Sequence, residues 1–200
     1  MMAETIRQPK QQRSIDKKNR IIAAGYELFA EKGYFNTNTA EIAKKAGVST
    51  GIVYGYFRDK RDILIDVLDI YIEKVSAKLY SIFEGRSEKC VLSELVAETL
   101  DVTVEIHKSN AAIHEALHSL SASDEQVSGK FLKLENEMTK QFVGYMKKFG
   151  YETDDIYERV HIAMTLAQSF SHEEVYDKHS YIDYSKMRAI VIRTIVSLFE

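Results

Sequence analysis

The chain is poor in several residue types that mark other classes of protein. Its 200 residues include one cysteine, one proline, nine glycines and no tryptophan. A single thiol excludes an intrachain disulfide framework and fits a reducing compartment. No apolar run approaches the roughly 18 residues of a membrane span, and the polar, basic N-terminus lacks the apolar segment of a secretory signal. We therefore expect a cytoplasmic protein that does not cross a membrane.

The residues that are present are typical of a helical globular protein. Hydrophobic residues make up 45% of the chain and charged residues 28%, proportions of a folded domain rather than a disordered one. The length is sufficient for one large domain or two small ones. Because helix breakers are scarce and helix formers dominate, the composition predicts an all-α fold.

Charge is distributed unevenly along the chain. Residues 1–61 carry 12 Lys and Arg against 6 Asp and Glu, whereas residues 62–200 carry 15 against 24. A basic N-terminal third is suited to binding a polyanion such as nucleic acid. Solvated helix faces produce the same imbalance, so charge alone leaves both interpretations open.

The N-terminal third begins with an arm and a helix. Residues 1–14 show little periodicity and are expected to form a flexible basic arm. Apolar residues at helical spacing then predict a helix over residues 17–32. Asp16 is the expected cap at its start, and Gly33 suits a left-handed stop at its end.

Two short helices follow at the spacing of a helix-turn-helix. Asn38 and Glu41 form a capping-box pattern that begins a helix ending at Gly47. Ser49 is positioned to cap a third helix over residues 50–57. The short connection between the two helices is typical of DNA-binding helix-turn-helix units.

The remainder of the chain is also predicted to be helical. A long fourth helix would link the N-terminal region to the body and could act as a lever. The expected helices span residues 60–83, 92–107, 111–120, 123–149 (capped by Ser123), from Asp154 or Asp155 to His172, and 184–199.

The third helix carries groups suited to DNA. A recognition helix places its N-terminal residues at base edges in the major groove, and here these are Ser49, Thr50 and Gly51. Tyr54 and Tyr56 add hydroxyls. The fourth helix begins with Lys60, whose charge favours a phosphate contact. The alternative is that the tyrosines are half-buried aromatics and that the glycines permit close helix packing.

This stretch resembles the N-terminal signature of the TetR (tetracycline-repressor) family of regulators. The residues that carry the resemblance are Gly33, Tyr34, Thr37, Ile42, Ala43, Ala46, Gly47, Val48, Ser49, Gly51, Tyr54, Tyr56, Phe57 and Lys60. It implies a DNA-binding domain over residues 15–75, with the helix-turn-helix at about 38–57, and a helical ligand-binding and dimerisation domain over residues 76–200. By motif position, the DNA-contacting residues are Thr39, Ser49, Thr50, Gly51, Tyr54, Gly55, Tyr56 and Lys60.

The family resemblance also implies a mode of action. We expect a homodimeric repressor that binds a palindromic double-stranded DNA operator and is released by a small molecule, with no enzymatic activity and no cofactor. An activator, or a DNA-binding protein without a ligand, would carry the same N-terminal domain. The effects of metabolites on DNA affinity would separate these alternatives.

A rival hypothesis rests on an H-E-x-x-H motif. His114 and His118 share a helix face and could bind Zn²⁺, with Glu115 activating a water molecule. The candidates for a further ligand are Glu135, Glu137 and His161. The sequence would then describe a zinc metalloprotease or a metal-binding protein. The short helix and the lack of a predicted strand argue against a protease, and in the plainer interpretation one histidine faces a polar pocket and the other is partly exposed.

The body contains candidates for a ligand pocket. Methionines, aromatics and histidines between residues 107 and 168 mix apolar walls with polar groups, as small-molecule sites do. We expect a partly apolar effector, although each such residue could instead be ordinary core. The candidate residues are His107, His114, His118, Met138, Phe142, Tyr145, Met146, His161, Met164 and Gln168.

Dimerisation is expected through the last two helices. One recognition helix reads only a few base pairs, so two related by a two-fold axis are needed for a useful operator. The proposed interface stripe comprises Ile190, Val191, Thr194, Ile195 and Leu198. The alternative is that this stripe packs on the core of its own chain.

Overall fold

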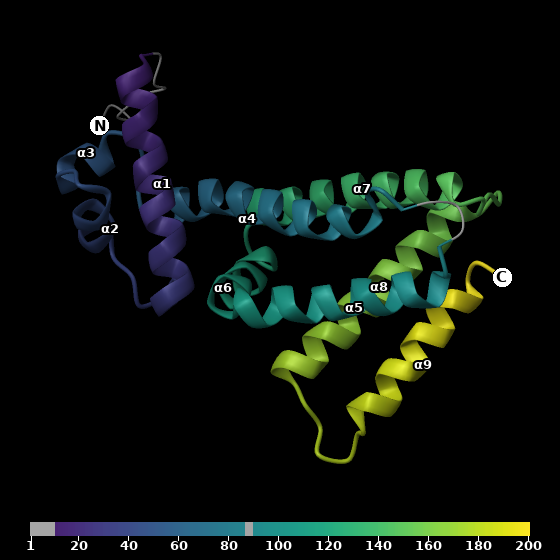
Figure 1. Cartoon of the computed structure of the whole chain (residues 1–200). Helices are drawn as coiled ribbons and strands as arrows, with labels where there is room; N and C mark the ends of the chain where they lie inside the picture. The colour runs from purple at the N-terminus through teal and green to yellow at the C-terminus, as the bar shows by residue number, and fades with distance from the viewer. Residues whose placement is uncertain (1–10, 87–89) are drawn as a thin grey trace. The chain divides into compact units, whose positions relative to one another are not determined.

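The computed structural model describes residues 11–86 and 90–200, and this part of the chain is α-helical without strands (Figure 1). The all-α prediction is confirmed. The helices are α1 (Gln12–Lys32), α2 (Thr39–Ala46), α3 (Thr50–Tyr54), α4 (Lys60–Phe83), α5 (Leu92–Ser109), α6 (Ala111–Ser121), α7 (Glu125–Lys148), α8 (Ile156–Tyr176) and α9 (Tyr184–Ser197).

The chain forms two compact units. The first contains the described chain as far as Glu73 together with Asn110–Gly129, and the second contains Lys74–Ser109 and Lys130–Glu200. The predicted boundary at residues 75 and 76 is therefore close to the first division, but the sequence did not predict that α6 belongs with the N-terminal helices. None of the described helices is both long enough and apolar enough to cross a bilayer.

Helix α1 begins five residues before its predicted start. The Gln12 side chain donates to Asp16 Oδ1 at 2.8 Å, and the hydroxyls of Ser14 and Tyr56 are 2.6 Å apart. These contacts stabilise an additional turn, so Asp16 lies inside the helix and does not cap it. Residues 12–14 of the expected arm are helical, and residues 1–10 lie outside the described chain.

The capping box of α2 is present as predicted. Asn38 Oδ1 accepts from the Glu41 backbone N–H at 3.0 Å, and Glu41 accepts from the Asn38 N–H at 3.2 Å. Gly47 ends the helix in the left-handed conformation, with φ 66°. A side chain would be strained at this φ, so glycine is required where the chain turns toward α3.

Helix α3 is shorter than predicted and ends at Tyr54. The N–H groups of Tyr56 and Phe57 both bond to Val53 O at 3.0 Å, so the chain turns tightly after the helix instead of extending it. Val53 and Phe57 are buried. The turn carries Tyr56 back toward α1, where its hydroxyl meets Ser14.

A close approach of α1 and α4 organises the core of the first unit. A Cβ at Gly25 would lie 2.7 Å from Ile63 Cγ2, so only glycine permits this approach. Lys18 and Asp66 form an ion pair between the same helices at 2.6 Å. Large apolar side chains that are almost fully buried in this unit are Ile21, Phe29, Ile42, Val53, Ile63, Leu64, Leu68, Ile113 and Leu117.

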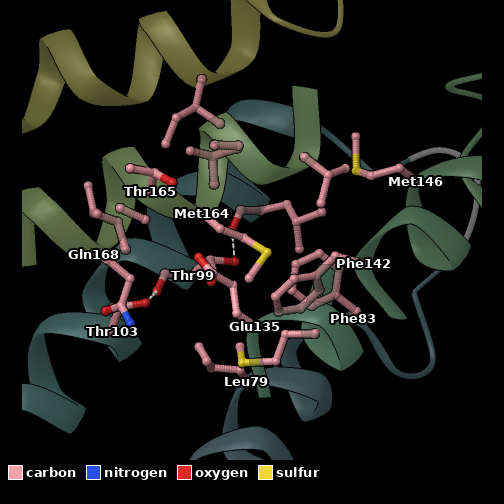
Figure 2. A pocket seen from close by; sticks show the side chains of 18 of the residues that line it. Leu79, Phe83, Thr99, Thr103, Glu135, Phe142, Met146, Met164, Thr165 and Gln168 are labelled. Atoms are coloured by element: carbon pink, nitrogen blue, oxygen red, sulfur yellow. Dashed lines mark hydrogen bonds between the residues drawn. The ribbon is translucent and has the colours of Figure 1, made fainter. Parts of the chain in front are cut away.

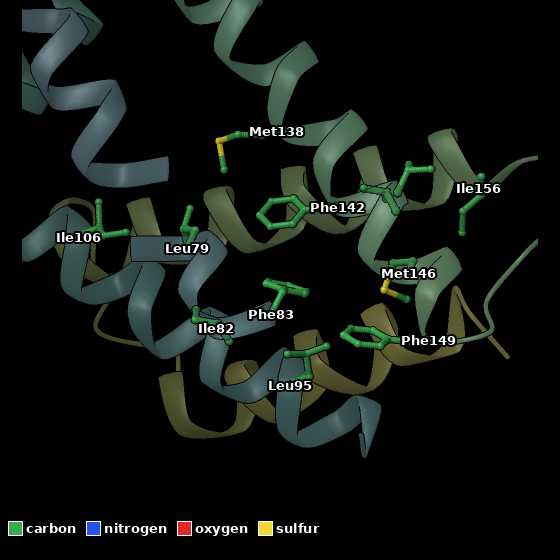
Figure 3. Packing of buried hydrophobic residues seen from close by; sticks show 12 residues of the cluster. Leu79, Ile82, Phe83, Leu95, Ile106, Met138, Phe142, Met146, Phe149 and Ile156 are labelled. Atoms are coloured by element: carbon green, nitrogen blue, oxygen red, sulfur yellow. The ribbon is translucent and has the colours of Figure 1, made fainter. Parts of the chain in front are cut away.

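The second unit is built from α5, α8 and α9 with the later parts of α4 and α7. Figure 3 shows the larger of its two apolar clusters, where side chains from α4, α5, α7 and α8 meet around Phe83 and Phe142. The second cluster joins α5, α8 and α9 around Phe170. Arg188 of α9 also bonds to Asp101 of α5 at 2.7 Å.

The helices of the body follow the predicted order, and several of their ends differ from the predicted ones. Asp124, and not Ser123, caps α7, because its Oδ1 accepts from the N–H groups of Gln126 and Val127 at 3.0 and 3.3 Å. Helix α8 continues to Tyr176, four residues beyond the predicted end at His172.

Candidate DNA-binding surface and ligand pocket

The start of α3 presents an exposed polar surface. Ser49 and Gly51 are exposed, Thr50 is half-buried, and the Ser49 side chain does not cap the helix. Tyr54 is 53% exposed, and its hydroxyl lies 3.1 Å from that of Thr39 on α2. The structure therefore places these five predicted DNA-contacting residues on α2, on α3 or in the turn between them.

Two of the other predicted contacts, Gly55 and Tyr56, lie in the turn after α3. Tyr56 is buried and its hydroxyl bonds to Ser14. Gly55 is exposed in the turn after α3, where a Cβ would lie 3.3 Å from Ile52 O. Their DNA contacts stay predictions, and the structure gives Tyr56 a role in joining α1 to the turn.

Lys60 has a structural role that the sequence did not predict. Its ammonium donates to the backbone carbonyls of Tyr34 and Thr37 at 2.6 and 2.8 Å, and lies 4.2 Å from the centre of the Tyr34 ring. Burial lowers the pKa of Lys60 from its usual value. An ammonium has three donors, so one remains for the predicted phosphate contact while two hold the loop between α1 and α2.

Gly51 occupies open space. A Cβ added at this glycine would have no atom within 4 Å among its surroundings, and its φ is not positive. The packing alternative considered for this glycine is therefore wrong, because nothing in the fold requires the absence of a side chain. Glycine in a helix costs about 1 kcal/mol relative to alanine, so a close approach by a partner remains a reason for it.

Cations near the helix-turn-helix are mostly paired. Arg58 binds Asp62 at 2.8 Å, and this hydrogen bond raises the pKa of Arg58 and lowers that of Asp62. Lys45 pairs with Glu27 at 2.9 Å, while Lys44 is exposed on the same helix. The sequence analysis did not include Arg58, Lys44 or Lys45 among the expected DNA contacts. The two adjacent lysines before the turn are a pattern that could have indicated a phosphate contact.

Arg61 connects the start of α4 to the start of α7 within the first unit. Its guanidinium binds both carboxylate oxygens of Asp124, with Nη2 to Oδ1 at 2.8 Å, and also bonds to Gln126 at 3.0 Å. The hydrogen bond from Arg61 holds the pKa of Asp124 below its usual value. The same carboxylate therefore caps α7 and binds the residue next to Lys60.

The second unit contains a cavity of about 370 Å³. Figure 2 shows its lining, with Thr99, Thr103 and Gln168 on one side of the view, Phe83, Phe142 and Met146 on the other, and Glu135 between them. Five of the predicted ligand residues line it: Met138, Phe142, Met146, Met164 and Gln168.

The other five predicted ligand residues do not line this cavity. His107 is buried and bonds to Thr103 O at 2.8 Å, Tyr145 stacks on Phe83 with ring centres 5.1 Å apart, and His161 is exposed. His114 and His118 belong to the first unit. Membership of the expected helices was thus insufficient, because the direction of each side chain decides what it lines.

Several lining residues were not predicted. They come mainly from α5 and α8, and the polar ones are Thr99, Thr103, Glu135, Thr165 and Ser169. Thr99 and Thr103 are four residues apart on α5, so they share one helix face. These two threonines on an otherwise apolar helix face are the sequence pattern that could have predicted this side of the cavity.

The H-E-x-x-H motif lies on α6. His114 is buried, His118 and Glu115 are exposed, and the two imidazole centres are 4.2 Å apart. The three candidates for a further ligand, Glu135, Glu137 and His161, all belong to the second unit. The pair alone provides two of the three or four protein ligands that zinc takes.

Comparison with known families identifies the N-terminal segment. Residues 21–67 match the family model of bacterial regulatory proteins of the tetR family. This segment runs from α1 into α4 and contains the whole helix-turn-helix. Residues 21–67 therefore resemble the DNA-binding segment of tetR-family regulators. The resemblance seen in the sequence is confirmed.

The curated relatives that this chain matches are named as regulators. It is 32% identical over 106 residues to the HTH-type transcriptional regulator HbdR of Aromatoleum sp. (strain CIB), covering 49% of this chain and 46% of that protein. It is 39% identical over 77 residues to the fatty acid metabolism regulator protein of Bacillus subtilis (strain 168), covering 38% of each. The matches thus cover less than half of these relatives. Both relatives are named as regulators, which supports the expectation that the chain is not an enzyme.

Solved structures extend the similarity in fold to nearly the whole chain. A tetR-family transcriptional regulator from Streptomyces coelicolor superposes with a TM-score of 0.71 at 14% identity, covering 92% of this chain and 80% of that one. A transcriptional regulator from Rhodococcus sp. Rha1 gives 0.68 at 17% identity, covering 90% and 95%. Both have the same arrangement of an N-terminal helix-turn-helix and a helical C-terminal domain.

Proposed function

We propose that this chain is a dimeric repressor of the TetR family that binds a palindromic operator and is released by a small molecule. The observation that carries the proposal is the match of residues 21–67 to the family, together with the exposed polar start of α3 in that segment. A regulator that acts on the bacterial chromosome works in the cytoplasm, which agrees with the composition.

Sequence reading is assigned to the start of α3. Thr50 and Ser49 are at the end of the helix that enters the major groove in such units, and Tyr54 and Thr39 extend the polar surface across α2. Side chains with hydroxyls can donate to or accept from base edges and phosphates. Gly51 would let the backbone approach the duplex without steric hindrance.

Release by a ligand is assigned to the cavity of the second unit. Its volume of about 370 Å³ is within the range of small-molecule sites. Helices α4 and α7 each contribute residues to both units, so a change at the cavity could reach Lys60 or Asp124 along a continuous helix. A ligand shifts the equilibrium only if it binds the released state more tightly.

Dimerisation is assigned to the exposed faces of α8 and α9, although the predicted stripe needs correction. Val191 and Ile195 are buried in the core of their own unit, so they are not available to a partner. Ile190 is 53% exposed and Ile162 47% exposed. Together with the exposed Thr194, they are the residues to which we assign the contact between copies.

Fluorescence anisotropy with labelled duplexes tests the proposal. We expect saturable, salt-sensitive binding of the full chain to a palindromic fragment from upstream of its own gene, and weak binding to a scrambled duplex. Thr50→Ala should reduce the preference for the cognate sequence. Equal affinity for the cognate and scrambled duplexes in the wild-type chain would contradict the proposal.

A displacement screen tests the ligand response. Metabolites are added to the preformed complex, and we expect an effector to lower the anisotropy of the operator. A metabolite that instead raises operator affinity would indicate that the ligand promotes DNA binding and does not release the operator. If every small molecule leaves the affinity unchanged, the chain is a DNA-binding protein without the proposed ligand response.

A further inference from the structure

The cavity of the second unit has an unusual balance of polar groups. One ionisable side chain, the carboxylate of Glu135, occurs among its described lining residues, and no Lys, Arg or His is found there. A carboxylate or phosphate ligand would lose its hydration without gaining a cationic partner, which is unfavourable. The charge of the lining therefore disfavours an anionic ligand.

The threonines of the lining also disfavour an anionic ligand. Thr99 donates its hydroxyl proton to Leu95 O at 2.8 Å, Thr103 to Thr99 O at 2.7 Å, and Thr165 to His161 O at 3.0 Å. A hydroxyl has one proton and two lone pairs. Once the proton is bonded to the helix backbone, each of these oxygens offers a ligand only an acceptor.

The apolar walls are also electron-rich. Phe83, Phe131 and Phe142 provide aromatic faces, and Met138, Met146 and Met164 provide thioethers. Aromatic faces attract cations, and thioether sulfur is a weak acceptor. Gln168 and Ser169 are the lining residues whose side chains retain donor capacity toward a ligand.

Glu135 is placed to meet a charged group at the edge of an apolar space. Its side chain is 48% exposed, and its Oε1 lies 3.8 Å from Nε2 of the exposed His161. This distance is longer than a hydrogen bond, so the imidazole does not occupy the acceptor positions of the carboxylate. An ammonium at Glu135 could stay partly hydrated while its apolar body fills the cavity.

The geometry points to a protonated amine with an apolar body as the ligand of this cavity. The ammonium would donate to Glu135 and to the lone pairs of the lining hydroxyls, and the body would pack among the phenylalanines and methionines. This inference rests on the proposed ligand-binding role of the cavity and specifies its chemical class.

Isothermal titration calorimetry of the full chain without DNA tests this inference. The probes are decylamine, decanol and decanoate, which share a chain length and differ in the charge of the head group, each used below the concentration at which it aggregates. We expect decylamine to bind about tenfold more tightly than decanol, as for one charge-assisted hydrogen bond, and decanoate to bind most weakly. The affinity of decylamine should fall as salt is raised.

Two variants separate the site from the surface. Glu135→Gln keeps the size of the side chain and removes its charge, and should abolish the preference for decylamine over decanol. Glu137→Gln is the matched control, because Glu137 is an exposed carboxylate on the same helix that does not line the cavity. It should leave all three affinities unchanged.

The outcomes distinguish this inference from the proposed function. Equal or tighter binding of decanol or decanoate, no binding of decylamine, or an unchanged preference in Glu135→Gln would each overturn the amine assignment, whatever the protein does on DNA. Decylamine binding that requires Glu135 but leaves operator affinity unaltered would support the assignment and contradict release by this ligand.

Discussion

At the scale of single residues, several side chains have roles that differ from their sequence-based interpretation. Lys60 was selected for its charge, yet two of its three protons hold the loop between α1 and α2. Tyr56 was selected for its hydroxyl, which bonds to Ser14. Residues of a binding surface can therefore also stabilise it, and stability must be measured before a loss of DNA binding is interpreted.

Replacing Lys60 tests its structural role. Lys60→Met keeps the aliphatic stem and leaves the carbonyls of Tyr34 and Thr37 without their donor, which should cost about 1–3 kcal/mol in the free energy of unfolding. Urea denaturation followed by circular dichroism measures this cost. Lys44→Met is the control, because Lys44 is exposed on α2. If both variants are equally stable, the loop does not depend on Lys60.

Two glycines make a contrasting pair. Gly51→Ala adds a methyl group to open space and should leave the chain equally stable or stabilise it by about 0.5–1 kcal/mol, while weakening operator binding. Gly25→Ala forces a Cβ against Ile63 and should destabilise the first unit by about 1–3 kcal/mol. Thermal unfolding and anisotropy are measured for both. Unchanged DNA affinity in Gly51→Ala would rule out a close backbone approach at this position.

At the scale of helices, the first turn of α7 depends on one carboxylate. Asp124 accepts from two backbone N–H groups of α7 and binds Arg61 of α4. A helix cap that is also half of an ion pair couples the end of one helix to the position of another. This coupling lies within the first unit, so it affects how the start of α4 is held.

Acid titration tests this coupling. Arg61 holds the pKa of Asp124 below 3.8 in the folded chain, whereas the unfolded carboxyl titrates near its ordinary value. The stabilisation is therefore complete above that ordinary value and is lost as the pH falls through the folded pKa. Asp124→Asn should lose about 1–2 kcal/mol at neutral pH.

The control for this titration is a neighbouring carboxylate. The unfolding midpoint in urea is compared at neutral pH and near pH 3 for the wild type, Asp124→Asn and Glu125→Gln. Glu125 is exposed in the same turn. We expect a smaller acid-induced loss only in Asp124→Asn, and the same loss in all three chains would show that Asp124 does not carry it.

At the scale of the whole molecule, operator binding should depend on association of two chains. Ile190→Asp places a charge on the exposed face of α9 without entering the core, since Ile190 is 53% exposed. Light scattering after gel filtration should show a shift from dimer to monomer, and operator affinity should fall. Leu132→Asp is the control, because Leu132 is 59% exposed on α7. A dimer that persists in Ile190→Asp would show that the interface lies elsewhere on the chain.

Much of the fold was predictable because its signals are local. The capping box at Asn38 and the glycine stop at Gly47 depend on residues within a few positions of one another. Apolar periodicity predicted every helix of the described chain, with errors confined to the ends. The early start of α1 was missed because its additional turn is held by Tyr56, which is 42 residues away from Ser14 in the sequence.

The sequence by itself determined the helical class, the helix-turn-helix and its resemblance to the TetR family, since each follows from short-range pattern. Only the tertiary structure decided which side chains line the cavity, why Val191 and Ile195 are core residues, and where Lys60 and Asp124 direct their hydrogen bonds. The physical reason is that periodicity shows which face of a helix is apolar but does not show which element packs against that face. The functions of buried and half-buried polar groups depend on residues that only folding brings within reach.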